Sequence, residues 1–428
     1  MFKYILSLLF LSTFLHADIQ LIKKENPDSN TTLLVVGGIH GDEPGGYFSA
    51  SILSSHYNIH SGNLWVIPNL NAQSIQKNLR GFNGDMNRKF SALKKNDKDA
   101  EVIKELKKII LCKNVSLVLN LHDGHGFYRQ QYKSSIFNPN AWGQTCVIDQ
   151  CTLSKDHKFS NLNDIALKVK EGMNKNLIES HHSFDVRNTK TKFYDEAMQH
   201  SLTFFAVTNN KPAFAIETSK DLSSLAQKVF YQLLAIEEFM KIMGINYTRK
   251  FDLSIASISE LLENYGNLTI NDNIVLDLNT IKKHLSYIPL KSKSNVFKFS
   301  HPLASYKRIK NRYIIYIGNK KITTLNAQYF EYDSHCPKYF EFEVDNVLQK
   351  VAKTSEISVN DDFKVLKDDS LRVNIIGFKT KNSKPETGVT VSYKSIDKRF
   401  SIDKNNKIFR VEYYKNNKFC SINMVHFK

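Results

Sequence analysis

The fold of this chain is decided by GGIHGDEPGG, the stretch from Gly37 to Gly46. It follows the apolar run Leu33–Val36, which predicts a short buried strand, and its glycines favour a tight turn. Within the turn, His40 and Glu43 stand three residues apart, so an imidazole and a carboxylate can reach one cation. A catalytic zinc takes nitrogen and oxygen ligands from three side chains. The stretch therefore predicts two metal ligands or, if the chain offers no third, an exposed polar turn.

A third ligand is offered where the apolar run Val115–Leu121 ends. His122 stands at the carboxyl end of this predicted strand, which is where side chains of neighbouring strands gather in an α/β sheet. His125 lies farther into a glycine loop and is the competing candidate. For either residue, a hydrogen-bonded loop histidine is the alternative. We expect His122 to be the ligand and His125 to lie beside it or toward a substrate.

A general base is offered by Glu217, which follows the apolar run Ala213–Ile216. A carboxylate at the end of a buried strand is costly without a partner. A metal site would supply that partner, whereas a salt-bridged strand end or a neighbour of a helix N-cap is the alternative interpretation.

A loop with two arginines lies between the first two ligands and the third, at residues 78–90. Arg80, Asn87 and Arg88 suit a substrate carboxylate, because a guanidinium binds a carboxylate through two parallel hydrogen bonds. A solvated basic loop is the alternative.

The order of elements predicts an α/β domain from residue 18 to 245. Expected strands cover 33–36, 64–67, 115–121, 202–207 and 213–216, and expected helices cover 100–111, 162–175 and 225–243. Such alternation indicates a mixed sheet flanked by helices. After Gly244 the pattern changes to short strands between polar turns, at 274–278, 313–317, 322–325, 339–344, 371–376, 389–393, 408–413 and 419–425, with hairpin turns expected at 404–407 and 415–418. We therefore predict a small barrel-like β domain over 246–335 and an immunoglobulin-like β-sandwich over 336–428.

Composition and the first residues indicate an exported protein. Residues 1–17 combine a lysine, an apolar run too short to span a bilayer and a closing alanine, as in a cleavable signal peptide. We expect a periplasmic protein with no membrane span once it is cleaved. The net charge of +17 comes from scattered lysines, which favours a solvated surface over a nucleic-acid site. Among the 5 cysteines, Cys146 with Cys151 or Cys336 with Cys420 could form a disulfide, and spacing does not decide between them.

The site residues together resemble those of zinc carboxypeptidases of the carboxypeptidase A type, over residues 18–245. The leader, the loop 123–126, the stretch 142–144 and the two β domains are similar to the cell-shape DL-carboxypeptidases of helical bacteria. That resemblance implies an enzyme that trims peptidoglycan stem tripeptides to dipeptides by removing the terminal meso-diaminopimelate, and so shapes the cell. Peptidoglycan stem peptides would be its binding partner, and the β domains could meet other proteins.

The resemblance also implies a role for each candidate residue. One Zn²⁺ would be held by His40, Glu43 and His122. Some relatives carry glutamine in place of the first of these histidines, whereas this chain keeps His40. The remaining roles would be general base and acid for Glu217, stabilisation of the scissile carbonyl for Arg80, binding of the terminal carboxylate for Asn87 and Arg88, and the part of a mobile tyrosine for Tyr194. For Trp142 two interpretations stay open: contact with the diaminopimelate side chain, or an exposed loop tryptophan that packs on its own domain.

Two other functions remain open at this point. An N-acyl-amino-acid deacylase of the aspartoacylase-like type shares the same ligand pair and the Asn-Arg pair, although the leader argues against it. A catalytically silent scaffold that binds peptidoglycan through its β domains is the other, although the complete set of ligands and Glu217 argues against that.

Overall fold

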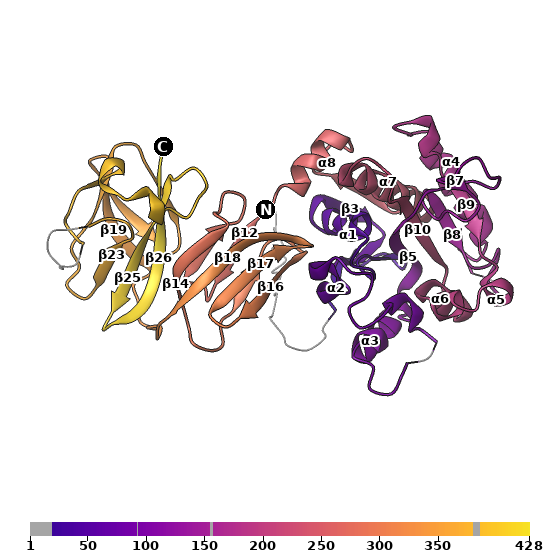
Figure 1. The fold of residues 1–428 in the computed structure, drawn as a ribbon, viewed down its shortest axis with the longest axis horizontal. Coiled ribbons are helices and arrows are strands. Elements are labelled where there is room, and N and C mark those ends of the chain that lie inside the picture. The colour runs from indigo at the N-terminus through magenta and orange to yellow at the C-terminus, as the bar shows by residue number, and fades with distance from the viewer. Residues whose placement is uncertain (1–18, 92, 155–156, 380–385) are drawn as a thin grey trace. The chain divides into compact units, whose positions relative to one another are not determined.

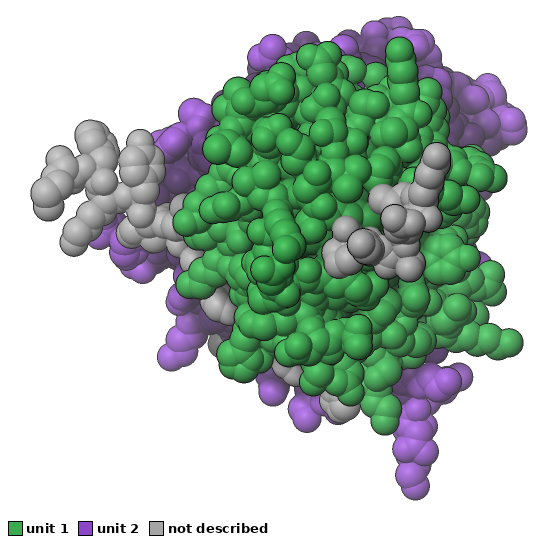
Figure 2. Space-filling model, turned by 90° about the vertical axis from the view of Figure 1, so that its left-hand side faces the viewer, with its two compact units in different colours: residues 1–13, 265–317, 321–428 green, residues 14–264, 318–320 purple. Residues whose placement is uncertain are grey.

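A computed structural model describes residues 19–91, 93–154, 157–379 and 386–428 of the chain (Figure 1). The predicted signal peptide, residues 1–17, lies outside these residues. Within them, no helix is long and apolar enough to cross a membrane. The chain divides into two compact units: one runs to residue 264 and includes 318–320, and the other holds 265–317 and 321–428 (Figure 2).

A mixed seven-stranded sheet forms the centre of the first unit, in the order β1-β4-β2-β5-β10-β8-β9. Its strands are β1 Ile22–Lys24, β4 Asn63–Ile67, β2 Thr32–Val36, β5 Val115–Gly124, β10 Ala213–Ser219, β8 Thr145–Ile148 and β9 Asp185–Asn188. The four central strands run parallel, whereas β1 and β8 are antiparallel to their neighbours β4 and β10. Every residue of β2 and β4 is buried, as expected for parallel strands covered on both faces. The sheet confirms the predicted α/β class.

Helices cover both faces of this sheet, with α7 above β5 and β10 and with α3 and α6 below them in Figure 1. The helices are α1 Pro44–His56, α2 Ala72–Lys77, α3 Ala100–Ile110, α4 Leu162–Asn174, α5 Thr191–Tyr194, α6 Leu202–Thr208, α7 Leu225–Met243 and α8 Ile255–Leu262. Helix α7 has the bounds that its apolar periodicity predicts. It begins after Ser224, whose side chain accepts a hydrogen bond from the Gln227 backbone, and it ends at Gly244, whose φ of 73° favours glycine.

The strand predicted over 202–207 is wrong, because these residues form helix α6. Its apolar residues are compatible with either structure, and the residue before them decides. The Ser201 side chain accepts a hydrogen bond from the Phe204 backbone and so caps the first turn of a helix. Helix α6 packs on β5 and β10 and adds no strand to the sheet.

The first unit continues beyond residue 245. Strand β11, Asn246–Arg249, pairs with β3, Tyr57–Ser61, and α8 packs on α7. The short strands β6, Phe127–Tyr128, and β7, Phe137–Asn138, form a separate parallel pair. The domain boundaries at 245 and 335 stay predictions.

The second unit is built from four small sheets. The first two, in the orders β13-β12-β15 and β14-β18-β17-β16, use β12 Asn267–Ile270, β13 Ile274–Asp277, β14 His284–Leu290, β15 Phe297–Phe299, β16 Ala304–Ile309, β17 Arg312–Ile317 and β18 Lys320–Tyr329. The other two, β20-β19-β22-β24 and β21-β26-β25-β23, use β19 Tyr339–Val344, β20 Val347–Ala352, β21 Glu356–Val359, β22 Asp362–Val365, β23 Arg372–Ile375, β24 Val391–Ser392, β25 Ile408–Lys415 and β26 Lys418–Phe427. These last two sheets bury one shared apolar core, as in a sandwich.

The structure decides between the candidate disulfides and tests the two predicted hairpin turns. Cys336 and Cys420 form a disulfide, whereas Cys146 is buried and Cys151 is exposed, both without a disulfide. The turn at 415–418 joins β25 to β26 with two asparagines at positive φ, as predicted. The turn at 404–407 does not join two strands. It folds around Asp403, whose carboxylate accepts hydrogen bonds from three backbone amides.

Candidate active site

The loop from β2 to α1 presents two side chains, His40 and Glu43, to the interior of the first unit. Glycine is required at position 41, because an added Cβ would lie 2.1 Å from the backbone of Ser74. The neighbouring glycine, Gly38, has a φ of 77°. The glycines that open the stretch therefore let the loop run close to α2 and turn both polar side chains inward.

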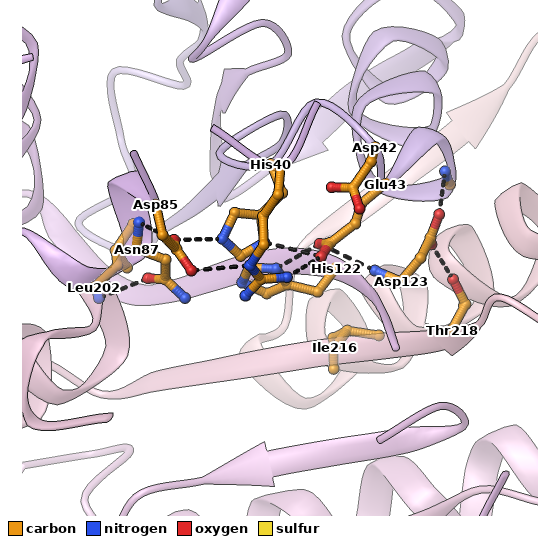
Figure 3. Close-up of polar contacts among 12 residues, drawn as sticks. His40, Asp42, Glu43, Asp85, Asn87, His122, Asp123, Leu202, Ile216 and Thr218 are labelled. Atoms are coloured by element: carbon orange, nitrogen blue, oxygen red, sulfur yellow. Dashed lines mark hydrogen bonds and ion pairs between the residues drawn. The ribbon is translucent and has the colours of Figure 1, made fainter. Parts of the chain in front are cut away.

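The third candidate, His122, lies on β5 and faces the same point. His122 Nδ1 is 2.8 Å from one Glu43 carboxylate oxygen, and His40 Nδ1 is 2.9 Å from the other (Figure 3). The two imidazole centroids are 4.9 Å apart. Strand β5 continues to Gly124, so His122 lies within the strand and not in the loop after it. Because the sheet holds this strand on both sides, the backbone that carries the imidazole is fixed in position.

These three residues fit a zinc ion. One ligand atom from each lies within 4.8 Å of the others, and all three side chains are buried. Two imidazole nitrogens and a carboxylate form the donor set of many catalytic zinc sites. Burial alone would raise the pKa of Glu43, but His40 and His122 hold it well below its usual range. The ligand set therefore stays anionic where a cation would sit. His125 is exposed on the cavity wall and does not belong to this cluster.

Asp85 is a part of the site that the sequence did not reveal. Its Oδ1 is 2.8 Å from His40 Nε2, and its Oδ2 accepts a hydrogen bond of 2.9 Å from Arg80 Nε. Burial alone would lower the pKa of His40, but Glu43 and Asp85 raise it to about 9. A carboxylate on the far nitrogen fixes the tautomer and ring orientation of a metal-binding histidine. The signal in the sequence that could have identified Asp85 is its place two residues before Asn87, which is predicted to bind the substrate.

Arg80 also contacts the ligand set from the side. Its Nη1 donates a hydrogen bond of 3.1 Å to Glu43 Oε1, and about half of its side chain is exposed. Held by Asp85 and Glu43, this guanidinium lies at the rim of the cluster with surface left for a substrate.

Glu217 stands beside His122 on the adjacent strand. The two residues are register partners in the β10 and β5 pair, so their side chains leave the same face of the sheet next to each other. Burial raises the pKa of Glu217 well above its usual range, and the negative charge of Glu43 adds to this rise. A carboxylate that holds its proton readily is suited to proton transfer.

A cavity of about 290 Å³ connects these groups. Its walls include the predicted residues His40, Glu43, Arg80, Asn87, Arg88, His122, Trp142 and Glu217, as well as the unpredicted Asp123, Val147, Met198, Thr203, Ala215 and Lys220. Tyr194 does not line it and is 77% exposed on α5. The structure thus brings together every predicted site residue except this tyrosine.

The loop of residues 78–90 is anchored around Asn87 and Arg88, the two residues expected to bind a carboxylate. Asn87 is buried, and its Oδ1 accepts a hydrogen bond of 2.9 Å from the Leu202 backbone, so its amide NH₂ is the group left for a ligand. Lys89 holds the loop through ion pairs with Asp97 and Asp99, at 2.9 and 2.8 Å. Arg88 forms no ion pair with the described residues, and its Nη1 donates to the Asn87 carbonyl. A guanidinium in this state can still take up a carboxylate.

Comparison with known proteins agrees with this geometry. The family model of carboxypeptidases controlling helical cell shape matches residues 1–263 through its catalytic part, and that of a metallo-carboxypeptidase C-terminal domain matches 333–428. The apo structure of the cell shape determinant protein Csd4 from Helicobacter pylori is 35% identical, with a TM-score of 0.90 over 96% of this chain and 100% of that chain.

Two ligand complexes of the same Helicobacter pylori protein match equally well. Its tripeptide-bound structure is 35% identical with a TM-score of 0.90, over 96% of this chain and 100% of that chain. Its mDAP-bound structure, of a D,L-carboxypeptidase, has the same identity and TM-score over 95% of this chain and 100% of that chain. No curated protein matches the chain.

Proposed function

The chain belongs to the family of metallo-carboxypeptidases that control helical cell shape, and we propose that it is a periplasmic, zinc-dependent DL-carboxypeptidase. Its substrate is the peptidoglycan stem tripeptide, from which it removes the terminal meso-diaminopimelate (mDAP) and leaves a dipeptide. The bound ligands of the Helicobacter pylori relative support this substrate. The family and the apolar leader at residues 1–17 support the periplasm.

One observation carries the proposal: a buried cluster of His40, Glu43 and His122 lies beside Glu217 in a single cavity. Bound there, zinc supplies a Lewis acid for the scissile carbonyl and lowers the pKa of water toward about 7. Glu217 accepts a proton from the attacking water and delivers it to the leaving amine, the two-way use of one carboxylate. Its position next to His122 supports a proton transfer at the ligand cluster.

Arg80 and Arg88 have different roles in this mechanism. Arg80, held by Asp85 and Glu43, offers fixed positive charge to the oxyanion that develops during the reaction. Arg88 and the amide of Asn87 bind the terminal carboxylate of the substrate, which fixes the scissile bond one residue from the chain end. Trp142 packs on the side chain of the departing residue.

The two other functions are less favoured. A deacylase of small metabolites does not agree with membership in a cell-shape family. A silent scaffold would not need a complete ligand set together with Glu217 in one cavity. With each of these functions, the β domains remain available to bind protein partners.

The test is digestion of purified muropeptides with the zinc-loaded protein, followed by mass analysis. We expect release of mDAP from tripeptides and no cleavage of tetrapeptides, whose extra D-alanine moves the terminal carboxylate away from the scissile bond. Glu217→Gln is the matched control, since it keeps shape and zinc but loses the base. Release of a diaminopimelyl-alanine dipeptide from tetrapeptides at the rate of tripeptide cleavage would indicate an endopeptidase and overturn the proposal.

A further inference from the structure

A second group of metal-ligating side chains lies in the segment between α4 and β9. Glu179, His181 and His182 each offer one ligand atom, and these atoms lie within 4.8 Å of one another. His181 Nδ1 is 3.3 Å from Glu179 Oε2, and the centroids of the two imidazoles are 4.3 Å apart. None of the three residues lines the cavity beside His122, so this group is separate from the candidate active site.

His182 is the fixed member of this group. Only 3% of the residue is exposed, and its Nδ1 forms a hydrogen bond of 3.0 Å with the Tyr231 hydroxyl on α7. The Phe127 ring lies parallel to the imidazole, with its centroid 5.8 Å away. Within the described part of the chain, the other ring nitrogen, Nε2, has no hydrogen-bond partner. An imidazole that is held at one nitrogen and free at the other is arranged as a metal ligand.

Hydrogen bonds also hold the backbone that carries the two histidines. Arg129 Nη2 donates a hydrogen bond of 2.6 Å to the His181 carbonyl. Gln144 Nε2 donates one of 2.7 Å to the His182 carbonyl, while Gln144 Oε1 accepts one from the Ser219 backbone at the end of β10. The main chain therefore sets the position of both imidazoles before an ion binds, which lowers the entropy cost of ordering them.

The donor set suits a divalent ion such as zinc. Two imidazole nitrogens and one carboxylate oxygen are ligands that zinc takes from proteins, and they leave a fourth position for water. About half of the Glu179 side chain and of the His181 side chain is exposed, so water can reach that position. A simple ion pair between Glu179 and His181 is the alternative, but that pair makes no use of the free nitrogen of His182.

We propose that Glu179, His181 and His182 form a second metal site, which binds Zn²⁺ and holds the segment between α4 and β9 in place. His182 binds the ion through Nε2 and donates its Nδ1 proton to the Tyr231 oxygen, which fixes the tautomer. The role is structural, because the group lies outside the cavity. Since two of the three ligands are exposed, we expect this site to bind zinc more weakly than the buried ligand cluster of the active site does.

The test counts zinc in a protein made without a histidine tag, because a tag would add binding sites. Equilibrium dialysis of the metal-stripped protein against Zn²⁺ should give two equivalents per chain. His181→Ala and Glu179→Ala should each lose the weaker equivalent, whereas His122→Ala should lose the tighter one and keep the other. His60→Ala is the matched control, because this exposed histidine belongs to neither group, and it should keep both equivalents.

Two further measurements examine how the second site is built and what it does. Tyr231→Phe removes the hydroxyl that holds His182 but no ligand, so the dissociation constant of the weaker equivalent should rise by about 10- to 100-fold while that of the tighter one stays unchanged. Zinc added to His122→Ala should still raise its Tm, and it should not raise the Tm of the double variant His122→Ala/His181→Ala. At saturating zinc, His181→Ala should cleave tripeptides as the unmodified protein does.

Several results would overturn the assignment. A single zinc equivalent in the unmodified protein would refute the second site, and so would a second equivalent that both His181→Ala and Glu179→Ala retain, because it would then be bound elsewhere. Zinc binding by His122→Ala without a rise in Tm would refute the structural role. Loss of tripeptide cleavage in His181→Ala would also refute that role and would assign the second ion to the reaction.

Discussion

Removal of the Asp85 carboxylate should weaken zinc binding without touching a ligand. Asp85 Oδ1 lies 2.8 Å from His40 Nε2, and the same carboxylate accepts hydrogen bonds of 2.9 Å from Arg80 Nε and from the Asn87 backbone. In Asp85→Ala the His40 ring loses the group that fixes its tautomer and orientation. Loss of such a partner typically costs 10–100-fold in metal affinity, or about 1.4–2.7 kcal/mol.

Asp85→Asn should separate the two tasks of this side chain. The amide oxygen can still accept from His40 Nε2, so we expect the zinc dissociation constant to rise by about tenfold or less. The amide NH₂ would face the Arg80 Nε donor, so Arg80 would keep only its hydrogen bond to Glu43. We therefore expect kcat/KM to fall more than zinc affinity does in this variant.

Competition with a chromogenic chelator measures zinc affinity, and tripeptide cleavage at saturating zinc measures catalysis. Asp42→Asn is the matched control for the metal assay, because Asp42 pairs with Lys220 at 2.8 Å and not with a ligand. A folded Asp85→Ala protein with unchanged zinc affinity would show that the His40 ring is held by its packing alone and would refute the reasoning.

Three other changes have defined outcomes. His122→Ala should abolish zinc binding at the candidate active site and activity together, while His125→Ala keeps this zinc; the opposite pattern in metal analysis would move the third ligand. Burial and a nearby lysine lower the pKa of Lys24 to about 8 in the folded protein. As pH falls from 10.5 to 8, the unfolded chain binds a proton at this amine before the folded protein does, so the free energy of unfolding decreases. Lys24→Met should therefore raise the free energy of unfolding at pH 7 by roughly 1–2 kcal/mol and give no gain above pH 10.5 in denaturant titrations; an equal gain at both pH values would contradict this. Cys420→Ser removes the bond to Cys336, which closes a loop of 84 residues, and should cost about 4–5 kcal/mol in the same titrations, whereas an unchanged midpoint would make the bond dispensable.

The sequence predicted those parts of the site whose residue type and place in the chain are both unusual. A histidine and a glutamate between glycines, and a glutamate that ends an apolar strand, have few other uses, and His40, Glu43 and Glu217 indeed share one cavity. Long periodic elements were equally readable, as α7 illustrates.

Residues whose role depends on strands distant in sequence could not be found in this way. Asp85 is one of many loop carboxylates until the fold brings it to His40. Val147 becomes part of the cavity only because β8 pairs with β10, which places it opposite Ala215. The strand expected over 202–207 failed for a related reason, since a cap at Ser201 outweighed a composition that suits a strand.

Helix α7 shows how much of the site is fixed away from the ligands. Gln232 is fully buried on it, and its Nε2 donates a hydrogen bond of 2.7 Å to the His122 carbonyl and one of 3.3 Å to the Ile216 carbonyl. These carbonyls belong to β5 and β10 at the level where His122 pairs with Glu217. One amide thus ties the helix to both strands, which carry His122 and the proposed base Glu217. A shift of the helix along the sheet would break these hydrogen bonds, which is costly for buried polar groups. The fold itself therefore holds the spacing between His122 and Glu217.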